Sequence, residues 1–299
     1  MTEARRREEA AGPVGRDGPV GVVGIGGDAA LTDKEQSLRG LLSSMGSVLV
    51  AFSGGVDSAY LAYVAHDILG DRALAVTADS PSYPERQRLL ALEIANTFGF
   101  RHQIIRTREL ERPEYRTNPT NRCYFCKQEL YSQLADMAGP LGATVVDGTN
   151  AEDRADYRPG RQAAREFLVR SPLDEVDLRK DEIRELARRA GLRSWEEPAS
   201  ACLSSRIPYH SEVTDEKLRM IEAAEAVLRD LGFSVCRVRH HDELARVELG
   251  PADVARAVEP SVRATIVREL KRIGYRYVTV DLQGYRTGSL NEGLLLRPA

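Results

Sequence analysis

Cysteine, long apolar runs and an excess of charge of one sign are all scarce in this sequence. Only four of the 299 residues are cysteine, which argues against a disulfide-stapled secreted protein and favours the reduced thiols of the cytoplasm. No apolar run approaches the roughly 20 residues of a membrane helix, so we expect no membrane partner. The 42 basic and 45 acidic residues leave a net charge of −3, which disfavours a basic domain that binds nucleic acid.

The beginning of the sequence mixes Arg, Glu, Gly and Pro and predicts a flexible tail over residues 1–32. Its stretch "GPVGVVGIGG" contains too much glycine to indicate a secretory signal. The remainder divides into a first unit over 33–192, a polar junction over 193–213 that carries Cys202, and a smaller α+β unit over 214–299.

Apolar, strand-like runs alternate with amphipathic helices in the first unit. Strands are predicted at 47–53, 73–78, 102–107 and 143–149, and helices at 58–70, 85–99, 123–138 and 179–191. This alternation is typical of an α/β fold in which a parallel sheet has helices on both faces. In such sheets ligands bind at the carboxyl ends of the strands.

The stretch "AFSGGVDSAYLAY" combines a buried strand, a short loop and the start of a helix. Gly54 and Gly55 allow a sharp turn and a close approach of the backbone to a ligand. The free N–H groups of the new helix favour an anion in the loop, and Ser53 and Ser58 add hydroxyl donors. No Gly-Lys-Ser/Thr is present, so this is not the usual P-loop. The pattern predicts a phosphate site rather than a plain capped turn.

This loop resembles the "SGGVDS" signature of the PP-loop ATP pyrophosphatases, which cleave ATP between the α- and β-phosphates and adenylate a substrate oxygen. The resemblance implies that ATP and Mg²⁺ are cofactors and that Asp57, within the loop, is a catalytic candidate. It also implies that Thr77 and Asp79 in "TADS" contact the adenosine. Gly148 and Asn150 in "DGTNAED" would lie near the nucleotide and Mg²⁺.

The cysteines suggest sulfur chemistry beside this loop. Cys123 and Cys126 stand at i and i+3 near the start of a predicted helix and therefore share one face, while Cys202 lies in the junction. Cys236 alternates with Arg237 in "FSVCRVRHH" and is predicted to be a small core residue. Three cysteines are one short of a closed zinc site and suit a [4Fe–4S] cluster with one open iron. A redox or zinc Cys-x-x-Cys remains the alternative for the pair alone.

Six stretches together resemble the LarE family, and the resemblance covers residues 34–292. They are "SGGVDS", "RCYFCK", "DGTNAEDRADYRPG", "ACLSSRIPY", "VCRVRHHDELARVEL" and "YRYVTVDLQGYRTGSLN". LarE proteins are sulfurtransferases that act on pyridinium-3,5-biscarboxylate mononucleotide during synthesis of the nickel-pincer nucleotide cofactor of lactate racemase. The resemblance implies adenylation of a pyridinium carboxylate, displacement of AMP by sulfur, and a homo-oligomer built from trimers.

Members of this family obtain sulfur in two ways. Some sacrifice a cysteine, which becomes dehydroalanine, and alignment on "SSR" would place that cysteine at Ala201 rather than at Cys202. Those members also lack the "CYFC" pair. Members with three cysteines use a cluster, which implies Cys123, Cys126 and Cys202 as its ligands. We therefore treat Cys202 as a catalytic cluster ligand, with a sacrificial Cys202 as the minority hypothesis.

Arginines of the junction and the smaller unit are candidate ligands for the phosphate of the mononucleotide. Arg237 and Arg239 face the same way on a predicted strand, and Arg206 lies in the junction. A solvated polar face is the alternative. Glu248, two residues after Arg246 on the next strand, is either catalytic or only an ion-pair partner. The roles of Asp153, Asp156 and Arg158 cannot be assigned from the motif "DYRPG" and its flank.

Three other functions remain open at this point. A tRNA thiolase also combines such a loop with three cysteines, and it would need a basic surface and salt-sensitive binding. An ammonia-dependent, amide-forming synthetase would use the same adenylation and would tolerate loss of the cysteines. A non-catalytic nucleotide-binding protein would release no pyrophosphate, and the number of motifs makes this the least favoured of the three.

Overall fold

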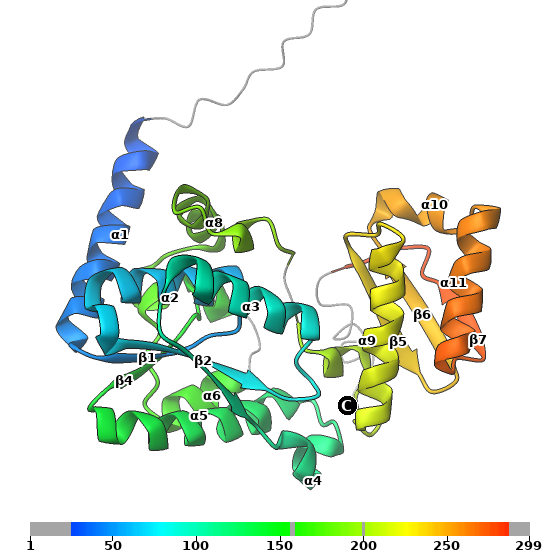
Figure 1. Cartoon of the computed structure of the whole chain (residues 1–299), viewed down its shortest axis with the longest axis horizontal. Helices are drawn as coiled ribbons and strands as arrows, with labels where there is room; N and C mark the ends of the chain where they lie inside the picture. The colour runs from blue at the N-terminus through cyan, green and yellow to red at the C-terminus, as the bar shows by residue number, and fades with distance from the viewer. Residues whose placement is uncertain (1–24, 156–158, 199–200, 287–299) are drawn as a thin grey trace, which may run out of the picture.

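The computed structural model describes residues 25–155, 159–198 and 201–286. Figure 1 shows two units joined by the segment that precedes α9. Helix α1 (Ile25–Met45) begins inside the stretch that was predicted to be a tail. The reason is that its apolar residues Leu31, Leu38 and Leu42 are buried in the core of the first unit. The remainder of the predicted tail, residues 1–24, lies outside the described residues.

The first unit alternates strands and helices, as the sequence predicts. Its strands are β1 (Val48–Ala51), β2 (Ala73–Asp79), β3 (His102–Arg106) and β4 (Thr144–Asp147). The helices that follow α1 are α2 (Val56–Leu69), α3 (Glu85–Phe98), α4 (Pro113–Arg116), α5 (Arg122–Leu141), α6 (Gly160–Glu166), α7 (Pro172–Glu175) and α8 (Lys180–Arg189). The strands run in the order β3-β2-β1-β4 and all pair in parallel, so the α/β class is confirmed.

Both faces of this sheet are covered at its centre, which explains why β1 is apolar and buried at every position. Val48 and Val50 of β1 point into one core with α1, α2, α3 and α8. Leu49 and Ala51 point into a second core with α5 and α6. Figure 1 shows α2 and α3 on one side of the sheet and α5 and α6 on the other. Because the strands are parallel, the loops that follow them lie along one edge of the sheet.

The second unit packs helices against a small mixed sheet. Its elements are α9 (Asp215–Asp230), β5 (Cys236–His241), β6 (Leu244–Leu249), α10 (Val254–Ala257), α11 (Pro260–Ile273) and β7 (Tyr277–Val280). Strands β5 and β6 are antiparallel, and β6 and β7 are parallel. Cys236 is 1% exposed and belongs to this core, which confirms its predicted packing role.

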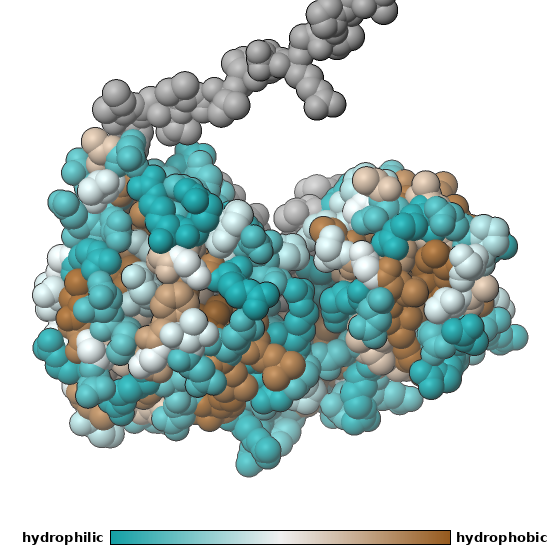
Figure 2. Space-filling model, turned by 45° about the horizontal axis from the view of Figure 1, so that its top comes forward, coloured by the Kyte–Doolittle hydropathy of each residue, from teal (hydrophilic) through white to brown (hydrophobic). Residues whose placement is uncertain are grey.

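The part of the junction that follows residue 200 packs against both units. Its residues Leu203, Ile207 and Val213 form a small apolar cluster with Tyr115 of the first unit and Leu218 of α9. Figure 2 shows a mainly hydrophilic face with smaller hydrophobic patches on both units and a hollow between them. In the described part of the chain, no helix has the length and apolar character needed to cross a bilayer.

Candidate functional site

The nucleotide loop lies between β1 and α2 and is braced from two sides. Internally, the Ser58 hydroxyl donates to the Gly55 carbonyl at 3.0 Å and accepts from the Ser53 backbone N–H at 3.1 Å. Externally, the Gln87 amide and the Tyr83 hydroxyl both donate to the Ser53 carbonyl at 3.0 Å. The loop is therefore fixed before a ligand arrives, with the amino end of the 14-residue helix α2 facing it.

Gly54 has no sterically equivalent substitute in this loop. Its φ angle is +66°, and a Cβ atom there would lie 3.0 Å from the Cβ of Ala91 on α3. Gly148, at the end of β4, has a similar role, because a Cβ atom there would stand 2.8 Å from the Ser58 backbone nitrogen. The predicted binding residue Gly148 thus lets the β4 loop approach the amino end of α2.

Asp57 is the charged residue of the loop, and its two carboxylate oxygens differ. Oδ2 lies 2.5 Å from Nζ of Lys180, the first residue of α8. Oδ1 is buried and has no hydrogen-bond partner among the described residues. An uncompensated carboxylate oxygen is the kind of ligand that Mg²⁺ takes up. Sequence reasoning missed Lys180, because nothing in "LRKDE" indicates contact with a loop more than a hundred positions earlier.

The ends of β2 offer less to a ligand than predicted. Thr77 is fully buried, and its hydroxyl lies 2.8 Å from the Phe52 carbonyl and 2.8 Å from Nε2 of His102. Any contact between Thr77 and adenosine would have to come from its backbone. Asp79 is half-buried at the last position of β2 and keeps a carboxylate at the edge of the sheet.

The loop after β4 is held by its own side chains. Asn150 is 3% exposed, and its Oδ1 accepts from the Glu152 N–H at 3.0 Å. The Asp153 carboxylate accepts from the Asn150 N–H at 3.1 Å. Asn150 therefore shapes this turn, and its predicted contact with the nucleotide stays a prediction. Asp156 and Arg158 lie outside the described residues.

The three predicted cysteine ligands come from two segments of the chain, and Cys202 lies near enough to influence the other two electrostatically. Cys123 and Cys126 occupy the first turns of α5, and Cys202 directly precedes the 3₁₀ turn Leu203–Arg206. Burial is the main cause that raises the pKa of Cys123, and the negative charge of a nearby Cys202 thiolate raises it further. All four cysteines of the chain are free thiols. In the described ranges, no three His, Cys, Asp or Glu side chains are arranged to hold a metal ion, so the cluster ligands stay a prediction.

The electrostatics around the pair are uneven. Burial raises the pKa of Cys126, and Glu109 and Cys202 raise it further. Around Cys123 the positive charges of Arg122 and Lys127 oppose the rise. Glu109 is 2% exposed, and its Oε2 has no hydrogen-bond partner among the described residues. Thiols whose pKa is raised stay neutral until a metal or a cation displaces the proton.

Hydrogen bonds fasten the Cys202 segment to the first unit. The Leu203 N–H donates to the Ser82 carbonyl at 2.8 Å. The Tyr115 hydroxyl lies 2.7 Å from the Ser82 hydroxyl and 2.5 Å from the Ser204 hydroxyl. Arg122 donates to the Ser204 carbonyl at 2.9 Å. This network keeps Cys202 close to the start of α5.

The candidate phosphate arginines are buried, so the alternative of a solvated face is wrong. Arg237 is 9% and Arg239 is 7% exposed, and both faces of β5 are covered. Arg206 is 2% exposed and forms an ion pair with Glu225, with nitrogen–oxygen distances of 2.8 and 3.2 Å. Burial and the neighbouring Arg206 lower the pKa of Arg237. Sequence reasoning missed Glu225, whose partner lies on another element.

These arginines are divided between two environments. A small cavity is lined by Arg206 and Arg237 together with Glu225, the start of α3 and Pro198 of the junction. Arg239 instead lies 2.8 Å from a carboxylate oxygen of Glu248 and donates to the Ser205 carbonyl at 2.9 Å. Of the three candidate arginines, Arg206 and Arg237 line this cavity, together with Arg86 and Arg229, and Arg239 does not.

Glu248 is completely enclosed and lies between two guanidinium groups. Besides Arg239, it pairs with Arg246 at 3.2 Å, which confirms the predicted ion pair. A carboxylate in this position does not reach the cavity surface. The structure bears out the ion pair of Glu248, and its catalytic role stays a prediction.

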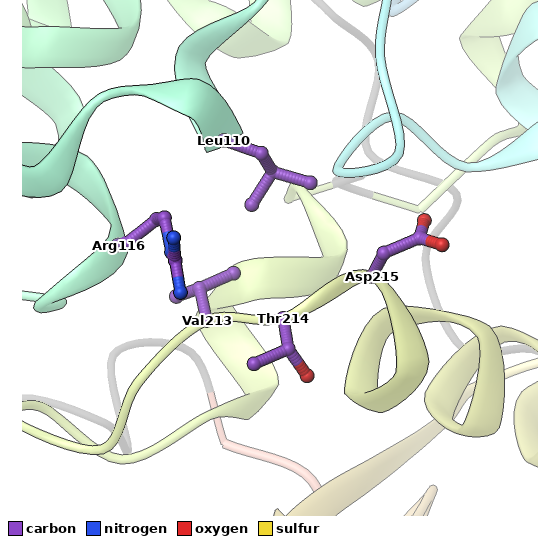
Figure 3. A pocket seen from close by; sticks show the side chains of 5 residues that line it. All are labelled: Leu110, Arg116, Val213, Thr214 and Asp215. Carbon is purple, nitrogen blue, oxygen red and sulfur yellow. The ribbon is translucent and has the colours of Figure 1, made fainter.

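Another cavity, of about 190 Å³, lies where α4 meets the start of α9. Figure 3 shows its lining side chains: Leu110 and Arg116 on one side, and Val213, Thr214 and Asp215 on the other. None of the candidate site residues lines it, and the Thr214 hydroxyl is occupied in capping α9.

Comparisons with known proteins match the chain over different lengths. The NAD synthase family profile matches residues 31–119. The chain is 44% identical to an uncharacterised protein of Synechocystis sp., over 88% of this chain and 99% of that protein. It is 28% identical to a glutamine-hydrolysing GMP synthase of Synechocystis sp., but over only 66% of this chain and 42% of that protein.

A further relative has a named activity. The chain is 38% identical to the pyridinium-3,5-bisthiocarboxylic acid mononucleotide synthase of Lactiplantibacillus plantarum, over 89% of this chain and 96% of that protein. The similarity therefore extends across both units and the junction between them. The chain belongs to the LarE family and is an ATP-dependent synthase of the PP-loop ATP pyrophosphatase class.

Proposed function

We propose that this enzyme adenylates a carboxylate of pyridinium-3,5-biscarboxylate mononucleotide and replaces the AMP with sulfur, in the synthesis of the nickel-pincer nucleotide cofactor. One observation carries the proposal: a single segment of the junction contains both a candidate residue for sulfur transfer and a candidate residue for phosphate binding. Its segment from Ala201 to Arg206 contains Cys202 and also Arg206 of the arginine-lined cavity. The similarity to the Lactiplantibacillus plantarum synthase supports the same substrate class.

In the first half-reaction, the chain binds ATP and a substrate carboxylate attacks the α-phosphate, with pyrophosphate leaving. The loop from Ser53 to Ser58 would hold the pyrophosphate through backbone N–H groups and hydroxyls. The free Oδ1 of Asp57 fits Mg²⁺, and Lys180 provides a positive charge at the same loop. Charge that develops on the departing phosphates is stabilised by these groups.

In the second half-reaction, sulfur displaces AMP and leaves a thiocarboxylate. We propose Cys123, Cys126 and Cys202 as ligands of a [4Fe–4S] cluster, and the donor set of three thiols fits a cluster with one open iron. When bound, such a cluster supplies an iron that can carry sulfide. Repetition on the second carboxylate gives the bisthiocarboxylate. Arg206 and Arg237 would bind the phosphate of the mononucleotide meanwhile.

A direct test is anaerobic purification followed by iron and sulfide analysis and by mass spectrometry of the peptide that contains Cys202. The proposal predicts iron and sulfide in the wild type, loss of both in Cys126→Ala, and an intact Cys202 after turnover. A metal-free protein in which Cys202 becomes dehydroalanine during turnover would establish the sacrificial mechanism instead. A cytoplasmic, trimer-based homo-oligomer is part of the same proposal and can be checked by light scattering of the purified chain.

The NAD synthase match favours one second candidate, an ammonia-dependent synthetase. That match spans the nucleotide loop but ends before Cys123 and the junction, so it supports ATP use alone. The synthetase would release AMP in response to ammonia, and Cys126→Ala would leave this activity intact. The sulfurtransferase would not respond to ammonia.

A further inference from the structure

Arg122 is a buried cation whose partners carry no charge. It is 3% exposed at the first position of α5, directly before Cys123. Its Nη1 donates to the side-chain oxygen of Asn118 and, at 2.9 Å, to the Ser204 carbonyl. Among the described residues, no carboxylate oxygen lies within 4.0 Å of the guanidinium nitrogens of Arg122, so it forms no ion pair there.

Arg206 provides the comparison within the same molecule. It is equally buried, but Glu225 neutralises it through a two-point contact at 2.8 and 3.2 Å. Burial of an unpaired charge is energetically costly, which is why buried arginines normally have an acid beside them. The Asn118 side-chain oxygen and the Ser204 carbonyl could accept hydrogen bonds from a neutral side chain equally well, so they do not explain why this residue is charged. The described part of the folded chain therefore supplies no counter-charge for the guanidinium of Arg122.

Two segments that carry cysteines meet at this guanidinium. Arg122 directly precedes Cys123 on α5, and its hydrogen bond to the Ser204 carbonyl reaches the turn that follows Cys202. The guanidinium thus lies between the two segments that carry these thiols. Lys127 adds a second positive charge near Cys123, and Glu109 adds the opposing negative charge near Cys126.

We propose that Arg122 is the fixed counter-cation of the three-cysteine site, pairing with the anionic group that Cys123 and Cys202 hold. The inference rests on the proposed cluster. Three thiolates outweigh the positive charge of an oxidised [4Fe–4S] core, so the loaded site is anionic and becomes more so on reduction. A buried guanidinium beside it stabilises the reduced form more than the oxidised form. Arg122 therefore raises the reduction potential, while its bond to Ser204 positions the Cys202 segment.

The experiment compares full-length chains reconstituted anaerobically with iron and sulfide: wild type, Arg122→Gln, Arg122→Lys and a control, Arg116→Gln. Arg116 lies at the end of α4 and pairs with the exposed Glu212 of the junction, so it links the same two segments without burial. The midpoint potential is measured by redox titration followed by electron paramagnetic resonance. We expect a more negative potential for Arg122→Gln, and a potential near that of the wild type for Arg122→Lys and Arg116→Gln.

Iron release to a chelator and thermal unfolding, with and without iron and sulfide, complete the test. Loss of the guanidinium should speed iron release several-fold and reduce the rise in melting temperature on loading, with little change in the unloaded protein. Faster iron release from Arg122→Gln than from Arg122→Lys would also support the proposal that the positive charge at this position stabilises the loaded site. An unchanged potential in Arg122→Gln, or equal iron loss from the Gln and Lys variants, would overturn the inference. A wild type that takes up no iron would instead contradict the proposed cluster.

Discussion

The nucleotide loop and the three-cysteine site differ in how the chain assembles them. The loop is one continuous stretch, fixed by its own serines and by two glycines that allow close packing. The cysteine site joins α5 to a distant junction through Tyr115, Arg122 and Ser204. Backbone geometry determines the first site, and buried side-chain contacts determine the second. The two half-reactions should therefore be separable by mutation.

The largest expected effect comes from the cysteine site. Cys126→Ala should abolish formation of the thiocarboxylate while ATP-dependent release of pyrophosphate stays within about 3-fold of the wild type, because the nucleotide loop is untouched. Sulfur-containing product is measured by mass spectrometry and pyrophosphate by a coupled assay. Cys236→Ala, in the core of the second unit, is the matched control and should retain sulfur transfer. Parallel loss of both activities in Cys126→Ala would show that the sites are not separable.

Asp57→Asn should have the opposite pattern. Removing the carboxylate that pairs with Lys180 and that we propose as a Mg²⁺ ligand should lower pyrophosphate release on the order of 100-fold, since one preorganised electrostatic contact is commonly worth that much. Iron binding should not change. Asp71→Asn, at an exposed position before β2, is the control. Near-normal pyrophosphate release in Asp57→Asn would contradict the assignment.

A smaller effect is expected at Lys180. Lys180→Met leaves the Asp57 carboxylate without its cation, and it should reduce kcat/KM for ATP on the order of 10-fold. Lys180→Arg should recover part of this loss, because the charge remains while its position changes. If the Met and Arg variants behave alike, the charge of Lys180 has no part in binding or turnover of ATP.

Gly54→Ala tests the backbone geometry of the loop. Strain at φ +66° and the contact with Ala91 should lower the free energy of unfolding by about 1–3 kcal/mol. Gly46→Ala is a matched control, because Gly46 has φ +71° but no atom within 4 Å of the added Cβ. Chemical denaturation should show a larger loss at Gly54. Equal losses would mean that packing on α3 contributes nothing.

The smallest expected effect concerns pH and the second unit. Burial, with help from Lys217, lowers the pKa of His240 from 6.5 to about 4. The unfolded chain then binds a proton that the folded chain does not, so stability should be constant above pH 6.5 and fall towards pH 4. His240→Gln should remove this part of the fall. Thermal unfolding at pH 7.5 and pH 5 measures it, and identical falls in both proteins would exclude His240 as a cause.

Much of the fold could be predicted from the sequence because its determinants are local. The strand–helix alternation and the Ser-Gly-Gly loop depend on neighbouring residues, and Cys236 was assigned to the core from period-2 alternation. The alternation predicts that Arg237 and Arg239 share one face of β5, but it does not predict their burial. Alternation identifies the two faces of a strand and cannot report that the junction covers the polar one.

The residues that were missed share one property: their partners are distant in sequence. Lys180 meets Asp57, Glu225 meets Arg206, and Arg122 meets the Ser204 carbonyl. No periodicity or motif encodes such pairs. The same limit applies to Glu248, whose ion pair with Arg239 on the neighbouring strand the sequence does not indicate.

The most direct test of the central claim follows the substrate itself. Reconstituted enzyme is incubated anaerobically with ATP, Mg²⁺, isotopically labelled sulfide and pyridinium-3,5-biscarboxylate mononucleotide, and the nucleotide is analysed by mass spectrometry. The account predicts replacement of one and then two carboxylate oxygens by labelled sulfur, with more product than enzyme and an unaltered Cys202. Unlabelled product that stops at one sulfur per chain, with Cys202 converted to dehydroalanine, would contradict it.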